Sequence, residues 1–201
     1  MKKSVVVVLT AVLVSICCFS EAMAAEKKKS SWYIGFGVGT GILEMDGDSA
    51  KDYRDDQDYS HAEDELTLNF GVGAILNPKL HLGFDMSTVL QELDLDKSNR
   101  SELYQVSNYF AALSYYPWSK GFFVKVGGGL SALVYDKDTD KDNDLDTYGG
   151  AGCLVGLGYD FWLGKSFNLG IHAEYSRQFY NDKDAPDDTD ILNVYLSFYW
   201  F

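Results

Sequence analysis

The sequence predicts an all-β fold, specifically an eight-stranded antiparallel up-and-down transmembrane β-barrel. Eight segments show alternating apolar and polar residues, as in strands with two unlike faces. Seven connections join these segments, and long acidic connections alternate strictly with short turns rich in Pro, Gly, Asn or Trp. Beyond the N-terminal leader there is no run of about 18 apolar residues, so a membrane crossing would require a closed barrel.

The N-terminal leader has the composition of a secretory signal peptide. Lys2 and Lys3 form a positive start, residues 5–19 are apolar, and residues 22–24 (Ala-Met-Ala) have the form of a cleavage site. A transmembrane anchor is the alternative, but the apolar run is too short for one. We therefore expect a cleaved signal peptide over residues 1–24, one barrel domain over residues 25–201, and export to the cell outer membrane.

Charge and cysteine content exclude several classes of protein. Loss of Lys2, Lys3 and Glu21 with the leader takes the net charge from −13 to −14. Because such a chain repels nucleic acid, we expect no nucleic-acid partner. Only Cys153 remains in the mature chain, so no internal disulfide can form. The Gly-x-Gly clusters lack the strand–turn–helix context of phosphate loops, and we expect no cofactor.

The first three strands separate cleanly into an apolar face and a small or polar face. They cover residues 32–39, 66–75 and 80–88. Their apolar faces are Trp32, Ile34, Phe36 and Val38; Leu66, Leu68, Phe70, Val72 and Ala74; and Leu80, Leu82, Phe84 and Met86. The opposite faces hold mostly Gly, Ser, Thr, Asn and isolated charges. Such faces cannot build a dry core but fit the narrow lumen of an eight-stranded barrel, so the bulky faces point into lipid.

The fourth strand is less regular. In residues 109–115 the alternate residues Tyr109, Ala111, Leu113 and Tyr115 fit a lipid face. Upstream, Tyr104 and Val106 have the opposite parity. We therefore predict a β-bulge near Ser107, where one extra residue would change the parity of the strand.

The fifth to seventh strands repeat the clean alternation over residues 122–135, 150–160 and 167–175. Their apolar faces are Val124, Val126, Leu130, Ala132 and Val134; Ala151, Cys153, Val155, Leu157 and Tyr159; and Phe167, Leu169, Ile171, Ala173 and Tyr175. In the eighth strand the more apolar face is Leu192, Val194, Leu196, Phe198 and Trp200, with Tyr199 and Phe201 on the other face. The register of this last strand stays open.

The connections give the barrel an orientation. Short turns lie at residues 77–79, 117–121 and 161–165, and the long loops are roughly residues 41–65, 91–102, 136–147 and 181–190. Bacterial outer-membrane barrels place short turns in the periplasm and long loops outside. The four long loops hold 25 of the 29 acidic residues of the mature chain, so the predicted outer end of the barrel is strongly acidic.

Four motifs resemble the small eight-stranded outer-membrane barrels of the OmpA transmembrane-domain and OmpX type, which belong to the Gram-negative cell envelope. They are residues 149–152 (Gly-Gly-Ala-Gly), residues 158–161 (Gly-Tyr-Asp-Phe), the hairpin of residues 115–124, and the terminal Tyr-Trp-Phe of residues 199–201. The resemblance implies a monomer surrounded by outer-membrane lipid and lipopolysaccharide. It also implies that the barrel-assembly machinery reads Phe201 as an assembly signal, although Asn193 and Ser197 depart from the family's apolar pattern upstream.

Five charged or titratable side chains lie on the predicted lumen face: Lys125, Asp160, Glu174, His172 and Asp85. A charge in a narrow lumen needs a partner, and we predict a Lys125–Asp160 ion pair with Glu174 or His172 nearby. Such a polar network could pack the lumen, or it could gate a narrow porin-like channel for small solutes or ions. Eight strands leave little more than side-chain volume inside, which favours packing.

His172, Glu174 and Ser176 share one strand face and suggest a hydrolase, such as a lipid A-modifying enzyme. However, residues two apart on a strand are nearly 7 Å apart, too far for a hydrogen-bonded triad without neighbouring strands. We therefore assign no catalytic residues and expect no enzyme activity.

The third long loop carries an Asp at every second position from Asp136. It is not an EF-hand, because Lys141 replaces Gly at the sixth position and Thr147 replaces Glu at the twelfth. A weak cation site at Asp136, Asp138, Asp140, Asp142 and Asp144 is one hypothesis. A solvated loop is the alternative, which charge runs generally favour.

The sequence therefore predicts an integral outer-membrane protein with a structural or surface-interaction role, whose acidic loops bind divalent cations or lipopolysaccharide. A narrow porin-like channel is the alternative, and a lipid A-modifying enzyme is a weaker one.

Overall fold

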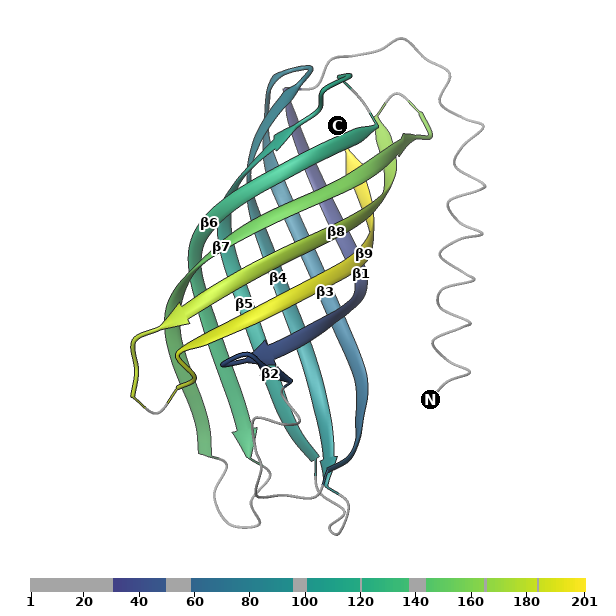
Figure 1. Ribbon diagram of the computed structural model, residues 1–201. Coiled ribbons are helices and arrows are strands. Elements are labelled where there is room, and N and C mark those ends of the chain that lie inside the picture. The colour runs from purple at the N-terminus through teal and green to yellow at the C-terminus, as the bar shows by residue number, and fades with distance from the viewer. Residues whose placement is uncertain are drawn as a thin grey trace.

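The computed structural model describes residues 31–49, 59–95, 101–119, 121–137, 144–164, 166–183 and 185–201. The strands are β1 (Trp32–Met45), β2 (Asp48–Ser49), β3 (Tyr59–Asn77), β4 (Leu80–Leu95), β5 (Ser101–Tyr115), β6 (Phe122–Lys137), β7 (Asp144–Trp162), β8 (Phe167–Tyr180) and β9 (Asp188–Trp200). Apart from the two-residue β2, each strand is antiparallel to the next, and β9 returns to pair with β1 (Figure 1). The predicted eight-stranded barrel is confirmed. The predicted signal peptide lies outside the described residues.

Among the described residues, no helix is both long and apolar enough to span a bilayer.

The strand faces point as the alternation predicts. Large apolar side chains on the outward face are exposed, among them Phe36, Val126 and Ile171. In β9 the outward residues include Leu192 and Trp200, while Tyr195 is buried inside the barrel. This settles the register that the sequence left open: the more apolar face of β9 points outward, because that face meets lipid.

The predicted bulge in the fourth strand is wrong. β5 pairs without a register shift with β4, from Ser101 to Tyr115, and without a shift with β6. Tyr104 and Val106 keep the inward parity of Phe110 and are buried. The parity argument failed because it assumed that bulky apolar residues must face lipid along the whole strand.

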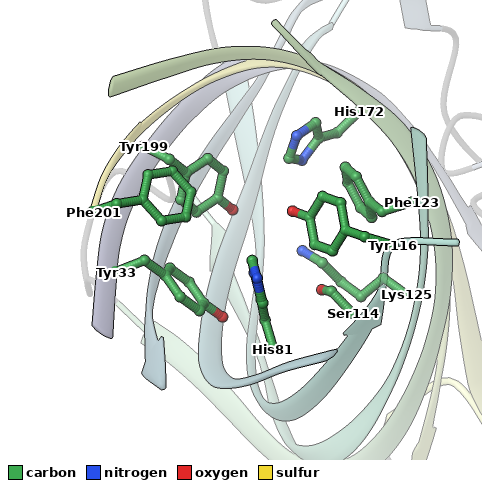
Figure 2. A pocket seen from close by; sticks show the side chains of 9 residues that line it. All are labelled: Tyr33, His81, Ser114, Tyr116, Phe123, Lys125, His172, Tyr199 and Phe201. Carbon is green, nitrogen blue, oxygen red and sulfur yellow. The ribbon is translucent and has the colours of Figure 1, made fainter. Parts of the chain in front are cut away.

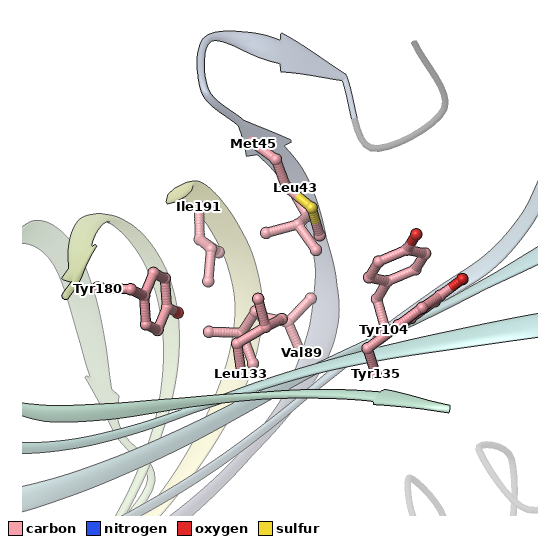
Figure 3. Packing of buried hydrophobic residues seen from close by; sticks show 9 residues of the cluster. Leu43, Met45, Val89, Tyr104, Leu133, Tyr135, Tyr180 and Ile191 are labelled. Atoms are coloured by element: carbon pink, nitrogen blue, oxygen red, sulfur yellow. The ribbon is translucent and has the colours of Figure 1, made fainter. Parts of the chain in front are cut away.

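Inward-facing apolar residues pack into a cluster at the long-loop end of the lumen (Figure 3). We call this group the apolar plug; its buried members are Leu43, Met45, Val89, Tyr104, Val106, Leu133, Tyr135, Tyr180 and Ile191. Tyr104 and Tyr135 stack with ring centroids 4.7 Å apart. The expectation that the lumen face cannot build a dry core is therefore wrong for the long-loop half of the barrel.

The barrel wall has unequal height. β3 and β7 have 19 residues each, whereas β8 has 14 and β9 has 13. A transmembrane strand needs about 9–11 residues, so the wall that runs from β3 to β7 extends well beyond the bilayer at the long-loop end. This extension carries backbone and side chains that the bilayer does not cover.

The residues in the turns suit the backbone conformations that the turns adopt. Between β1 and β2, Asp46 and Gly47 both have positive φ (52° and 84°), the backbone of the type I′ hairpin turn that favours Asp-Gly. At the short-turn end, the amide of Lys79 donates a 2.9 Å hydrogen bond to the side chain of Asn77. Ser119 and Gly121 also have positive φ, in the turn between β5 and β6.

Candidate functional site

The polar core of the lumen lies in the short-turn half of the barrel, on the short-turn side of the apolar plug. Its side chains come from inward positions on β4, β6, β7, β8 and β9, and Figure 2 shows several of them pointing toward one another across the barrel. Because successive residues of a strand point to opposite faces, alternate positions such as His172 and Glu174 both enter the lumen.

Lys125 lies at the centre of this region and bridges two strands across the lumen. Its Nζ donates to Asp85 Oδ2 at 2.6 Å and to Glu174 Oε1 at 2.7 Å. The Lys125 side chain is only 5 % exposed. Burial of a single ammonium group is costly unless carboxylates compensate it, so these two contacts are what allow Lys125 to remain charged here.

A second group of hydrogen bonds continues from Glu174 to the short-turn end. The Tyr195 hydroxyl donates to Glu174 Oε1 at 2.6 Å and lies 3.2 Å from His172 Nδ1. His172 Nε2 lies 3.1 Å from Asp160 Oδ1, and Tyr116 donates to Asp160 Oδ2 at 2.8 Å. The side chains thus form one connected network from Asp85 to Tyr116.

One hydrogen bond of this network can be assigned by counting donors. The single hydroxyl hydrogen of Tyr195 goes to Glu174, so the hydrogen in the contact with Nδ1 belongs to His172. His172 Nε2 has two polar neighbours, Asp160 Oδ1 at 3.1 Å and the hydroxyl of Ser197 at 2.8 Å. His172 thus links β8 to both β7 and β9 inside the barrel.

The predicted Lys125–Asp160 pair is wrong. Lys125 lies opposite Gly156 of β7, and Asp160 is four residues further toward the short turn. At about 3.3 Å per residue this is about 13 Å along the strand. Asp160 instead lies opposite Gly170 of β8, one inward position from His172, so His172 becomes its partner.

Aromatic rings fill the space around the network at the short-turn end. Phe201 packs against Trp162 with centroids 4.8 Å apart, and His81 packs against Tyr116 at 4.6 Å. Glycines on neighbouring strands make room for these rings; for example, a Cβ at Gly35 of β1 would overlap the ring of Tyr199 on β9. Phe201 thus faces the lumen and Trp200 faces lipid, while the role of Phe201 as an assembly signal stays a prediction.

Two small cavities lie in the described part of the lumen, and both are lined by Lys125 and Tyr199. Each has a volume of about 10 Å³, roughly the space of one water molecule. One of them is also lined by Asn69, whose side-chain Nδ2 has no protein partner. A bound water would satisfy this amide, but two cavities of this size do not make a continuous aqueous path.

The three hydrolase-type residues do not act together. The hydroxyl of Ser176 accepts a 2.8 Å hydrogen bond from Gln178 Nε2, and no contact joins it to His172. Ser197 does lie 2.8 Å from His172 Nε2, but Asp160 contacts the same nitrogen. A catalytic triad needs the acid on the opposite nitrogen, so neither serine belongs to one.

A cluster outside the lumen was missed by the sequence reasoning. Arg177 faces outward at the long-loop end of β8, and its guanidinium contacts Asp188 at 2.5 Å and Asp190 at 3.7 Å. The Tyr175 hydroxyl donates to Asp190, and Arg177 stacks over Phe179. This is where the outer surface changes from apolar to charged, and the outward parity of Arg177 could have indicated it.

Tyr116, Tyr195 and Ser197 were also missed as members of the lumen network. The inward parity of β9 would have identified Tyr195 and Ser197, but the sequence left the register of that strand open. The predicted cation-site residues are only partly covered: Asp138, Asp140 and Asp142 lie outside the described residues, and the side chains of Asp136 and Asp144 are not described. Among described residues, no three His, Cys, Asp or Glu side chains form a metal-binding group.

Comparison with known proteins agrees with this architecture. The family model described as "Outer membrane protein beta-barrel domain" matches residues 9–199. The Neisserial surface protein A structure is 14% identical with a TM-score of 0.54, covering 85% of this chain and 97% of that one. Ail, the attachment invasion locus protein of Yersinia pestis, is 11% identical with a TM-score of 0.57, covering 84% and 96%. Among curated proteins, no significant match was found.

Proposed function

The chain belongs to the family of outer-membrane β-barrel domains, and from that premise we propose that it is a closed barrel that acts through its acidic outer end. Its role is structural or surface-interacting, and its loops bind divalent cations that bridge to lipopolysaccharide phosphates. The outer membrane is the location that family membership implies.

The observation that supports this proposal most directly is the filled lumen. The apolar plug occupies the long-loop half, and the ion pairs of Lys125 and the rings around Phe201 occupy the short-turn half. Because the lumen has little free volume, we place any specific activity on the outer end of the barrel. This argues against the channel alternative, and the separation of Ser176 from His172 argues against the enzyme.

Charge supports the choice of ligand. The mature chain carries a net charge of −14, and the predicted outer loops hold most of its acidic residues. Hard divalent cations prefer carboxylate oxygens, and a bound cation can neutralise a phosphate on a neighbouring lipid. The Ail structure was solved with the heparin analogue sucrose octasulfate; the negative charge of this chain opposes such a polyanion unless a cation intervenes.

The test is lipopolysaccharide retention by the barrel refolded in lipid nanodiscs. We expect lipopolysaccharide to remain bound in millimolar Mg²⁺ and to be released by a chelator. Changing Asp136, Asp138, Asp140, Asp142 and Asp144 to Asn should weaken retention. Changing five first-loop residues to Asn (Asp52, Asp55, Asp56, Asp58 and Asp64) is the matched control for total charge. Retention that is indifferent to Mg²⁺ would refute the proposal, and equal effects of both sets would refute the third-loop site.

A further inference from the structure

All four tryptophans of the chain lie at the short-turn end of the barrel, the end at which Figure 1 shows the C-terminus. Trp32 begins β1, Trp162 ends β7, Trp200 ends β9, and Trp118 lies in the turn between β5 and β6. Each indole is exposed, and Trp118 is 71 % exposed. Because an indole ring favours the boundary between lipid and water, these residues mark the level of a membrane surface.

The same end of the chain is rich in lysine. Each of the three short turns, residues 77–79, 117–121 and 161–165, contains one lysine and no Asp or Glu. Three more lysines, residues 27–29, precede β1 in the sequence. Lys79 is described and exposed, whereas the other five lie outside the described residues and are counted here only by their positions in the chain.

Acidic residues do not offset this positive charge. The long loops hold 25 of the 29 acidic residues of the mature chain. Of the other four, Asp85, Asp160 and Glu174 lie in the lumen, where Lys125 or His172 contacts them. Glu26 and a carboxylate on Phe201 would offset at most two of the six lysine charges. The two ends of the barrel therefore carry opposite charge.

Exposed apolar side chains accompany the lysine of the described turns. Leu76 precedes the turn that contains Lys79, and Leu163 lies in the turn between β7 and β8; both are exposed, as is Trp118. A soluble anion would neutralise a lysine but would leave these apolar groups in water. A neutral lipid would cover the apolar groups but would not compensate the charge. A lipid with an anionic headgroup provides both contacts.

We propose that the short-turn end binds the headgroups of anionic phospholipids, with Lys79 at the phosphates and with Leu76, Trp118 and Leu163 against the upper acyl chains. Short turns of bacterial outer-membrane barrels face the periplasm, so these lipids belong to the periplasmic leaflet. This inference goes beyond the proposed function, because it concerns the opposite end of the barrel, another lipid and a contact that needs no divalent cation.

The tryptophans make a local test possible, since their fluorescence reports only on lipids at the short-turn end. The barrel is refolded in phosphatidylcholine bilayers that contain a small fraction of either phosphatidylglycerol or phosphatidylcholine brominated near the headgroup end of the acyl chains. Bromine quenches a neighbouring indole. In the presence of a chelator, we expect brominated phosphatidylglycerol to associate at least about fivefold more strongly than brominated phosphatidylcholine, and high salt should reduce this preference.

Two charge reversals localise the contact. Lys79→Glu changes an exposed lysine at the short-turn end, and Lys183→Glu changes an exposed lysine between β8 and β9 at the long-loop end. Both variants have the same net charge. Lys79→Glu should remove at least half of the preference for phosphatidylglycerol, whereas Lys183→Glu should leave it unchanged. Heat-modifiable gel mobility verifies that both variants fold.

The outcomes separate this inference from the proposed function. Equal quenching by the two brominated lipids would overturn it, and so would equal effects of the two charge reversals. A preference that appears only with Mg²⁺ would assign the lipid to carboxylate-bound cations and would also overturn it. A preference that persists in the chelator, while lipopolysaccharide is released, would support both proposals. Loss of lipopolysaccharide retention in Mg²⁺ would remove the proposed function and leave the phospholipid contact in place.

Discussion

Lys125 is the residue on which the polar half of the lumen depends. It forms ion pairs with Asp85 and Glu174 at 2.6 and 2.7 Å, and Glu174 also accepts a hydrogen bond from Tyr195. The sequence identified all three charged residues as inward because strand parity is reliable here. It could not identify the partners, because pairing across a lumen depends on how neighbouring strands are staggered around the barrel.

Replacing Lys125 should be costly, because it leaves two carboxylates buried without their cation. We expect Lys125→Met to lower the free energy of unfolding by about 3–5 kcal/mol, measured by equilibrium denaturation in lipid. Adding Asp85→Asn and Glu174→Gln should recover most of this loss, since no buried charge then lacks a partner. Lys79→Met, at an exposed turn position, serves as the control. A loss below about 1 kcal/mol in the single variant would show that the ion pairs are unimportant.

Two glycines should differ sharply in their tolerance of a methyl group. A Cβ at Gly39 would overlap the backbone of β9, whereas a Cβ at Gly149 would meet nothing within 4 Å. We expect Gly39→Ala to cost about 1–3 kcal/mol through overpacking and Gly149→Ala to stay within about 0.5 kcal/mol of the parent. Denaturation midpoints of the two variants, compared in the same lipid, test this difference. Equal midpoints would contradict the close approach of β1 to β9.

At the scale of the strand, β5 shows where sequence reasoning stops. Its half nearer the short turn was predicted correctly because outward residues such as Tyr109 are bulky, whereas the inward residues include the polar Asn108 and Ser114. Its half nearer the long loops was predicted wrongly, because Tyr104 and Val106 are apolar and point inward into the apolar plug. Period-two patterning reports a contrast between two faces, and the contrast disappears wherever both faces are apolar. For the same reason, the alternation of apolar and polar residues did not predict the apolar plug.

The apolar plug should respond to cavities as a protein core does. Leu133 is 2 % exposed inside it, whereas Leu130 on the same strand is 69 % exposed on the outer face. Leu133→Ala should cost about 2–5 kcal/mol because it leaves a cavity. Leu130→Ala should cost less, since lipid fills the vacated space. Unfolding of both variants in the same bilayer provides the comparison, and an equal or larger cost at Leu130 would contradict a packed plug.

At the scale of the whole molecule, two unlike barriers lie in series along the barrel axis. The apolar plug excludes water by packing, and the Lys125 network holds fixed charges in a region with cavities of about 10 Å³. An ion crossing the barrel would have to pass both. Eight strands enclose little more than side-chain volume, and here large aromatic rings occupy much of it.

We therefore expect the refolded barrel to show no discrete single-channel steps in planar bilayers, with or without Mg²⁺. Leu133→Ala should remain silent as well, because the ion pairs of Lys125 still block the short-turn half. Lys125→Met should also remain silent, because the apolar plug is intact. A barrel whose conductance changes on replacing Lys125 alone would behave as a gated channel, and the function would then have to be assigned to the lumen instead of the acidic outer end.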